Sequence, residues 1–230
     1  MLDAVTPHPS PADHTAARES LCTWSRRMVR DGLVVGTSGN LSLRTGDLIA
    51  VTPSGVDYET MTPSDVVLVD DAGTVAAGDR EPTSELALHL AAHARPGTTA
   101  VVHTHSPAAV ATSLLVDEVP PVHYQLAMFG GSVRVAGYAP FGSDELVANA
   151  VAALGDSTAV VLGNHGTLVL GDTLGAAYDG ARQLEWLCEV WLRARAAGEP
   201  RLLSAAEISE AVRRFAAQKR RVRATTPGTR

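Results

Sequence analysis

Hydrophobic residues recur along much of the chain every three to four positions, the period of a helix with one buried face. From Pro11 to Asp31 this spacing predicts a helix that ends at Asp31-Gly32, with a buried stripe of Ala17, Leu21, Trp24 and Met28. The same period predicts helices over residues 83–93, 108–115, 143–154 and 173–197. A final helix opens with the capping box Ser204-Ala-Ala-Glu207.

Short apolar runs between turn residues predict strands over 41–44, 48–51, 66–70, 74–76, 100–103, 133–136, 159–162 and 167–170. Several strands follow one another after a short turn, which favours a largely antiparallel or mixed sheet. We therefore expect one α/β or α+β domain with a central sheet and helices on its faces. The expected division is a loose lead-in over 1–10, a domain over 11–220 and a disordered basic tail over 221–230.

Composition narrows the class of protein. A chain of 230 residues, 45% of them hydrophobic, is long enough for one large domain with a substantial core. The net charge of −6 gives no electrostatic footprint for nucleic acid. The sequence shows neither a signal peptide nor an apolar run long enough to span a bilayer, so we expect a cytoplasmic protein with no membrane partner. Cys22 and Cys188 lie in helical apolar patterns and are expected to be reduced core residues.

Histidines at the end of an apolar strand are the first candidates for chemistry. His103 and His105 follow the run Ala100–Val102, and residues two apart on a strand point to the same face. Two imidazoles on one face could bind zinc, although they could equally be hydrogen-bonded polar residues. His165, in the tight turn Gly163-Asn-His-Gly166, is a candidate third ligand, and Glu85 is a candidate fourth.

Three clusters of glycine and short hydroxyl residues suit a phosphate group. They are Gly36–Ser42, Thr52–Gly55 and Thr83–Glu85, which offer backbone N–H groups and hydroxyls. The last cluster was expected in the first turn of a helix, where free N–H groups favour an anion. Each cluster also has a plain structural reading, as a turn before a strand or as an ordinary helix cap.

Six ordered motifs resemble the class II aldolase/adducin family, and within it the L-fuculose-1-phosphate aldolases. The motifs are Ser38–Ser42, Thr52–Gly55, Pro82–Glu85, Val102–His105, Val122–Tyr124 and Asn164–Gly166. The resemblance implies a single-domain three-layer α/β/α sandwich around a mainly antiparallel sheet. It also implies a homotetramer with active sites at subunit interfaces and a Zn²⁺ cofactor, with another divalent metal as an alternative.

The resemblance assigns roles to individual residues. It makes His103, His105 and His165 zinc ligands, and Glu85 both a ligand and the catalytic acid/base. Tyr124 would reach a neighbouring subunit's site as a proton donor. The phosphate-binding positions would be Asn40, Ser54, Gly55, Thr83 and Ser84.

Some positions depart from the family pattern or have no match in it. Gln218 stands where the sugar aldolases carry a C-terminal catalytic tyrosine, which puts the identity of the aldehyde in doubt. His89 and His93, which match no motif, are expected to be partly buried or surface residues. His123, next to Tyr124, is a candidate neighbour of the residues that act at the site.

The resemblance implies a zinc-dependent aldolase that cleaves a ketose-1-phosphate, like L-fuculose-1-phosphate, to dihydroxyacetone phosphate and a small aldehyde. Alternatives with the same site are a pentulose-5-phosphate 4-epimerase and a methylthioribulose-phosphate dehydratase. The epimerases typically carry aspartate where Glu85 stands, although Pro53–Met61 resembles them. A non-catalytic scaffold like the adducin head would lack the metal ligands.

Overall fold

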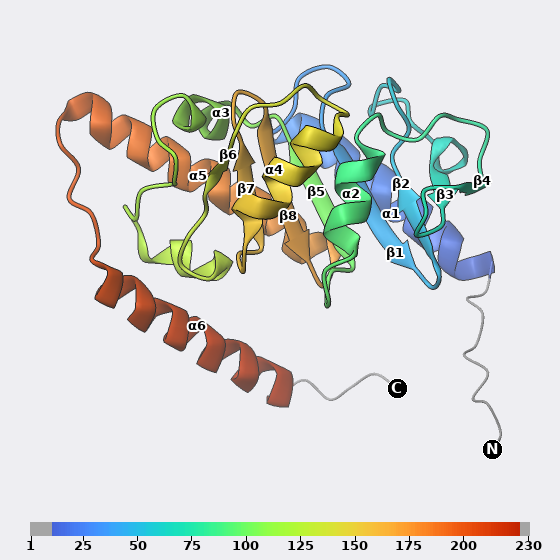
Figure 1. The fold of residues 1–230 in the computed structure, drawn as a ribbon. Helices are drawn as coiled ribbons and strands as arrows, with labels where there is room; N and C mark the ends of the chain where they lie inside the picture. The colour runs from blue at the N-terminus through green and yellow to red at the C-terminus, as the bar shows by residue number, and fades with distance from the viewer. Residues whose placement is uncertain (1–10, 226–230) are drawn as a thin grey trace.

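One mixed sheet of eight strands organises the molecule (Figure 1). The computed structural model describes residues 11–225. The spatial order of the strands is β4-β3-β2-β1-β5-β8-β7-β6, and every neighbouring pair is antiparallel except β6–β7. Their bounds are β1 Asn40–Thr45, β2 Leu48–Val51, β3 Val67–Val69, β4 Val75–Ala77, β5 Ala100–Thr104, β6 Val135–Ala136, β7 Ala159–Leu162 and β8 Gly166–Gly171.

Helices cover both faces of the sheet, which gives the expected three-layer α/β/α sandwich. In Figure 1, α2 (Leu86–His93) and α4 (Asp144–Leu154) lie in front of the sheet, and α1 (Pro11–Arg30) and α5 (Leu174–Ala197) lie behind it. The short α3 (Pro107–Ser113) packs against α5. The helix α6 (Ala205–Thr225) lies apart from the sheet and contacts η2 (Tyr124–Phe129).

The strand β5 is buried on both of its faces because each helical layer forms its own core with the sheet. Val101 packs into the core under α2 and α4, whereas Val102 packs into the core under α1 and α5. Both side chains are fully buried. Cys22 and Cys188 are free and buried in the second of these cores, as predicted. Close packing on both faces therefore holds β5, the strand that carries His103, in place.

Several element bounds differ from the prediction. The helix expected from residue 83 begins only at Leu86, with Glu85 in the N-cap position, so Thr83 and Ser84 precede the helix and are not its first turn. The reason is that this backbone is already paired: Thr83 N–H donates to the Thr52 carbonyl, and Ser54 N–H donates to the Glu81 carbonyl, each at 3.0 Å.

The C-terminal part shows smaller differences. The strand predicted over 133–136 is reduced to the two residues of β6. The capping box predicted for the last helix is present, with the Ser204 N–H donating to Glu207 at 2.8 Å. That helix runs to Thr225, past the boundary predicted at residue 220, and residues 1–10 and 226–230 lie outside the described part. The short helices η1 (Pro63–Asp65) and η2 were not predicted.

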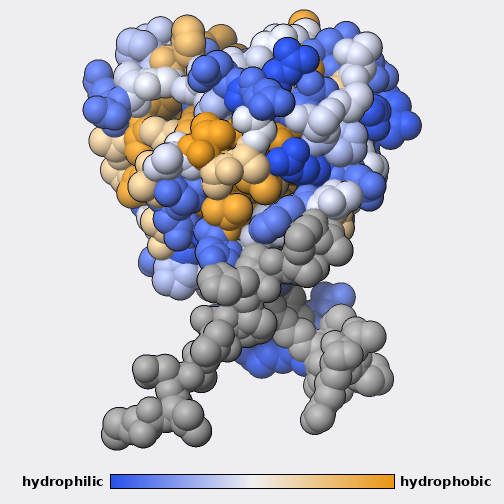
Figure 2. All heavy atoms as spheres, turned by 90° about the vertical axis from the view of Figure 1, so that its right-hand side faces the viewer, coloured by the Kyte–Doolittle hydropathy of each residue, from blue (hydrophilic) through white to orange (hydrophobic). Residues whose placement is uncertain are grey.

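Exposed hydrophobic side chains occur on the surface. Figure 2 shows a cluster of hydrophobic side chains, surrounded by hydrophilic ones, on the face at the β3–β4 end of the sheet. The edge strand β4 is exposed, and its residue Val75 has 46% exposure. Within residues 11–225, no helix is long and apolar enough to cross a membrane.

Candidate active site

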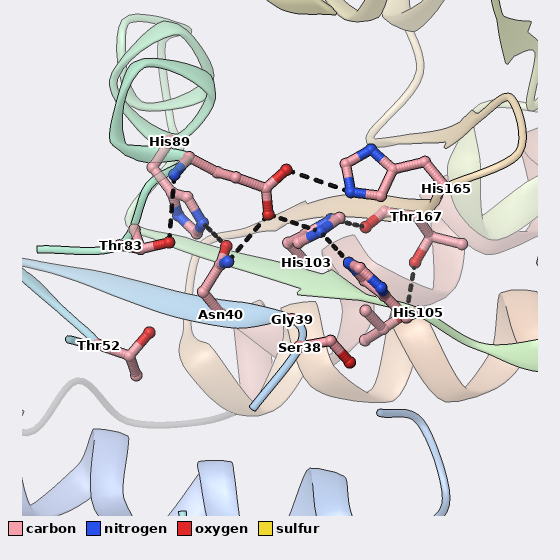
Figure 3. Close-up of polar contacts among 12 residues, drawn as sticks. Ser38, Gly39, Asn40, Thr52, Thr83, His89, His103, His105, His165 and Thr167 are labelled. Atoms are coloured by element: carbon pink, nitrogen blue, oxygen red, sulfur yellow. Dashed lines mark hydrogen bonds and ion pairs between the residues drawn. The ribbon is translucent and has the colours of Figure 1, made fainter. Parts of the chain in front are cut away.

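The fold brings together the four residues predicted to bind metal (Figure 3). His103 lies on β5, and His105 lies just beyond the strand's end. His165 comes from the turn between β7 and β8, and Glu85 comes from the start of α2. The antiparallel pairing of β5 with β8, with Thr104 opposite Thr167, places the His165 turn beside the two strand-end histidines. One ligand atom from each residue lies within 4.8 Å of those of the other three.

Glycines permit the close backbone approaches around this cluster. A Cβ atom on Gly166 would lie 2.0 Å from the Thr104 carbonyl oxygen, so only glycine lets the His165 turn reach the end of β5. Gly39 has a φ of +71°, and a Cβ there would lie 2.9 Å from the His103 carbonyl oxygen. The turn that carries His165 is itself strained, because Asn164 has a φ of +57°.

The donor set fits a divalent metal ion. His103 Nε2 lies 3.0 Å from His105 Nε2 and 2.9 Å from a Glu85 carboxylate oxygen, while His165 Nε2 lies 3.2 Å from the other carboxylate oxygen. Tetrahedral ligands bound at about 2.0–2.1 Å are separated by roughly 3.3 Å, close to these spacings. Glu85 Oε1 is fully buried next to His165, which suits an oxygen that faces a cation shared with that imidazole.

Hydrogen bonding selects the nitrogen that His103 presents. Its Nδ1 lies 2.9 Å from the Thr167 carbonyl oxygen, which can only accept a hydrogen bond, so Nδ1 carries the proton. In the neutral ring, Nε2 is then a free lone pair directed toward His105 and Glu85. A carbonyl partner of this kind is the usual means of fixing the tautomer of a metal-binding histidine.

Burial and neighbouring charges set the ionisation of the cluster. Burial raises the pKa of Glu85, but without a metal ion a protonated His103 beside it, with hydrogen bonds from His103, His165 and Asn40, outweighs burial and holds the pKa well below its usual range. Burial, with His103 and His165 nearby, lowers the pKa of His105 to about 4. An ionised carboxylate and neutral imidazoles are the protonation states that bind metal.

The three polar clusters predicted for phosphate binding meet on one side of the metal ligands. The Leu41 N–H donates to Thr52 Oγ1 at 3.1 Å, which ties the first cluster to the second. An isolated antiparallel bridge between Pro53 and Pro82 ties the second to the third. Hydroxyl groups and backbone from three distant segments therefore converge beside Glu85.

A pocket of about 310 Å³ opens over these residues. The polar part of its wall includes all the predicted phosphate-binding residues: Asn40, Ser54, Gly55, Thr83 and Ser84. Glu85, His105 and His165 also line it, whereas His103 is fully buried behind them. Tyr138, Ala139 and Phe141, which the sequence did not single out, also line the pocket. Tyr138 and Phe141 are 65% and 74% exposed.

His89 and His93 are not the partly buried or surface residues that were expected. His89 is fully buried and His93 is 5% exposed. His89 Nε2 lies 2.6 Å from Asn40 Oδ1, and both histidines contact the Ser42 hydroxyl (Figure 3 shows the His89–Asn40 pair). Their spacing was the overlooked signal: positions 85, 89 and 93 recur every four residues, so they share one face of a helix.

Two other predicted residues lie away from the pocket within this chain. Tyr124 is 53% exposed on η2 and is not among the pocket residues. His123 packs against Tyr124 and against Trp186, with ring centroids 4.4 and 4.9 Å apart, so it is not a neighbour of the histidine–glutamate cluster. Gln218 is exposed on α6.

Comparison with known proteins gives a consistent result. Residues 19–192 match the family described as Class II Aldolase and Adducin N-terminal domain. A 5-deoxy-D-ribulose 1-phosphate aldolase of Bacillus thuringiensis is 36% identical over 201 residues, covering 86% of this chain and 94% of that protein. A 5-methylthioribulose-1-phosphate/5-deoxyribulose-1-phosphate aldolase of Rhodospirillum rubrum is 38% identical over 207 residues, covering 89% and 93%.

A solved structure shares the fold. An L-fuculose 1-phosphate aldolase superposes with a TM-score of 0.85 and 34% sequence identity, covering 91% of this chain and 99% of that one.

Proposed function

The chain belongs to the class II aldolase/adducin family and is a class II aldolase, and from this premise we propose that it cleaves a ketose-1-phosphate reversibly to dihydroxyacetone phosphate and a small aldehyde. The observation that carries the proposal is that two sites share one pocket. A cluster of three histidines and a glutamate lies beside converging hydroxyl and glycine segments that suit a phosphate.

We propose that His103, His105, His165 and Glu85 hold Zn²⁺. Three nitrogen donors and one carboxylate oxygen that lie within 4.8 Å of one another are a donor set that zinc accepts. When bound, the metal supplies Lewis-acid polarisation of the substrate carbonyl. Glu85 would have two uses, as a metal ligand and as a carboxylate that carries a proton.

The proton transfers of the cleavage follow from the proposed roles. The substrate's C4 hydroxyl loses its proton, the C3–C4 bond breaks, and C4 leaves as the aldehyde. The electron pair stays on the three-carbon fragment, which takes up a proton at C3 to give dihydroxyacetone phosphate. Glu85 delivers the C3 proton in this scheme, and Tyr124 of a neighbouring subunit in a homotetramer handles the proton on the aldehyde oxygen.

Uncharged groups in the pocket lining favour a second candidate substrate. Tyr138, Ala139 and Phe141 line the pocket with two rings and a methyl group. An aldehyde with an apolar end suits such a lining better than a polyhydroxylated one. A 5-deoxy-pentulose-1-phosphate, the kind of substrate in the names of two relatives, is therefore a candidate beside the fuculose-type ketose.

An NMR assay of candidate phosphorylated ketoses tests the function. We expect zinc-loaded protein to convert L-fuculose-1-phosphate or 5-deoxyribulose-1-phosphate to dihydroxyacetone phosphate and the matching aldehyde. A pentulose-5-phosphate inverted at C4, or 5-methylthioribulose-1-phosphate that loses water, would instead support the epimerase or dehydratase alternative. No turnover of these ketoses by protein with bound metal would contradict the proposal.

Removal of single hydroxyls from the phosphate cluster tests the substrate's orientation. We expect Thr83→Ala and Ser54→Ala to raise KM for the ketose phosphate about tenfold each, because each loses a hydrogen bond to a charged group worth about 1.5–3 kcal/mol. The kcat values should change much less, since a phosphate contact is made equally in the ground and transition states.

Thr60→Ala is the matched control, because Thr60 is exposed and is not among the pocket residues. Steady-state kinetics at saturating zinc measure both constants for all three variants. A fall in kcat at unchanged KM would place the phosphate elsewhere.

A further inference from the structure

A buried chain of hydrogen bonds runs from the candidate catalytic carboxylate into the core. Asn40 Nδ2 donates to Glu85 at 3.0 Å, and Asn40 Oδ1 lies 2.6 Å from His89 Nε2. His89 Nδ1 lies 2.6 Å from the Ser42 hydroxyl, which lies 2.8 Å from His93 Nε2. All five side chains are at most 6% exposed. Apart from Glu85, only Asn40 has a role in the proposed reaction, as a phosphate contact.

The carboxylate end fixes the direction of every bond in this chain. An ionised Glu85 can only accept, so the amide nitrogen of Asn40 faces it and the amide oxygen faces His89. His89 must therefore carry its proton on Nε2. His89 is fully buried, and a neutral ring with its proton on Nε2 presents Nδ1 as an acceptor.

The remaining links follow from His89. Its Nδ1 accepts the Ser42 hydroxyl proton, and the Ser42 oxygen then accepts from His93 Nε2–H. His93 Nδ1 ends the chain as a buried atom that makes no hydrogen bond within the described residues.

We propose that His89, supported by Ser42 and His93, is a positioning residue that locks the Asn40 amide with its nitrogen toward the pocket. Asn40 Nδ2 has two hydrogens; one serves Glu85, and the other is available to the pocket that Asn40 lines. If the Asn40 amide flipped, so that its oxygen and nitrogen exchanged places, the oxygen would face both the Glu85 carboxylate and the incoming phosphate. The inference rests on the proposed function in one respect, the phosphate that Asn40 receives.

Substitution of His89 separates positioning from packing. His89→Gln keeps an N–H donor near the position of Nε2, whereas His89→Leu fills similar space without a donor. We expect the leucine variant to bind inorganic phosphate about tenfold more weakly in calorimetry with zinc-loaded protein. In part of the molecules the Asn40 amide would be flipped, with its oxygen in place of its nitrogen. The glutamine variant should recover to within about threefold of the parent. The calorimetric test needs no turnover, so it remains decisive if no ketose phosphate is cleaved.

A double-mutant cycle with Asn40→Ala isolates the mechanism. Once the amide is absent, His89→Leu should cause no further loss of phosphate affinity. An equal loss in both backgrounds would overturn the proposal, as would a folded glutamine variant that binds phosphate as weakly as the leucine variant. Should the leucine variant fail to fold, the ¹⁵N spectrum of the parent decides: a proton on His89 Nε2 is expected, and one on Nδ1 contradicts the lock.

Discussion

A Glu85→Gln chain is expected to lose about 10³-fold in kcat for ketose-phosphate cleavage while it remains folded. Glutamine has the same shape and keeps an oxygen that can accept the Asn40 N–H, so the buried hydrogen-bond chain survives. It cannot take up or return the C3 proton, and general acid–base catalysis contributes about 10²–10⁴-fold. The measurement is single-turnover cleavage at saturating zinc, with bound metal determined on the same sample.

Two controls define what the Glu85 result means. Glu81→Gln removes an exposed carboxylate four residues away and should leave kcat within about twofold, as is usual for surface changes. Full cleavage activity in the Glu85→Gln chain would contradict the assignment of Glu85 as acid/base. Loss of activity that excess zinc restores would make Glu85 a ligand only.

Mixing the Glu85→Gln chain with a Tyr124→Phe chain tests the proposed subunit interface. In randomly mixed oligomers, roughly a quarter of the sites would pair an intact Glu85 with an intact Tyr124 from a neighbour. If each variant is inactive alone, recovery of about a quarter of the parent activity in the mixture supports the homotetramer proposal. If the mixture stays inactive, Tyr124 does not act across an interface.

His103→Ala is expected to abolish metal binding at stoichiometric zinc and to reduce cleavage by about 10³-fold or more. His103 is the fully buried member of the ligand set, and its Nε2 lies within 3.0 Å of both His105 and Glu85. Loss of this ligand also leaves Glu85 without its nearest imidazole. Changes to residues that only support metal ligands already cost about 10–100-fold in affinity, so removal of a ligand should cost more.

Metal removal and return provide the matching chemical test. A strong chelator should abolish activity of the parent, and zinc should restore it. Cobalt or manganese tested in place of zinc would show which ion the site prefers. The control variant is His14→Ala, a histidine on α1 that contacts Thr45 and lies outside the ligand set. Unchanged activity in metal-free protein, or full zinc binding by His103→Ala, would exclude these four residues as the metal site.

Much of the proposed metal-ligand set could be predicted because its chemistry is local. The two-residue spacing of His103 and His105 on a strand fixes their common face whatever the rest of the fold does. His165 in a glycine-flanked turn was a candidate for the same reason, since such a turn forces one side chain to its tip. The family resemblance supplied the order of the motifs and the three-layer fold, which the structure and the comparisons confirm.

The start of α2 shows where local reasoning failed. Thr83 and Ser84 have the composition of a helix cap, yet their backbone pairs with residues 52–54 and delays the helix to Leu86. That pairing depends on a contact about thirty residues away in sequence, which no local pattern encodes. It is also what places Thr83 beside Ser54 in the pocket wall.

The sequence by itself determined the elements, the candidate ligands and the polar clusters, because helix period, strand alternation and turn chemistry act over a few residues. Only the tertiary structure decided that three polar clusters share one pocket and that His89 and His93 are buried partners of Asn40 and not surface residues. Those facts depend on how β1, β2, β5 and α2 pack, and packing joins residues 40–50 positions apart. The orientation of one amide at the site is set by that packing.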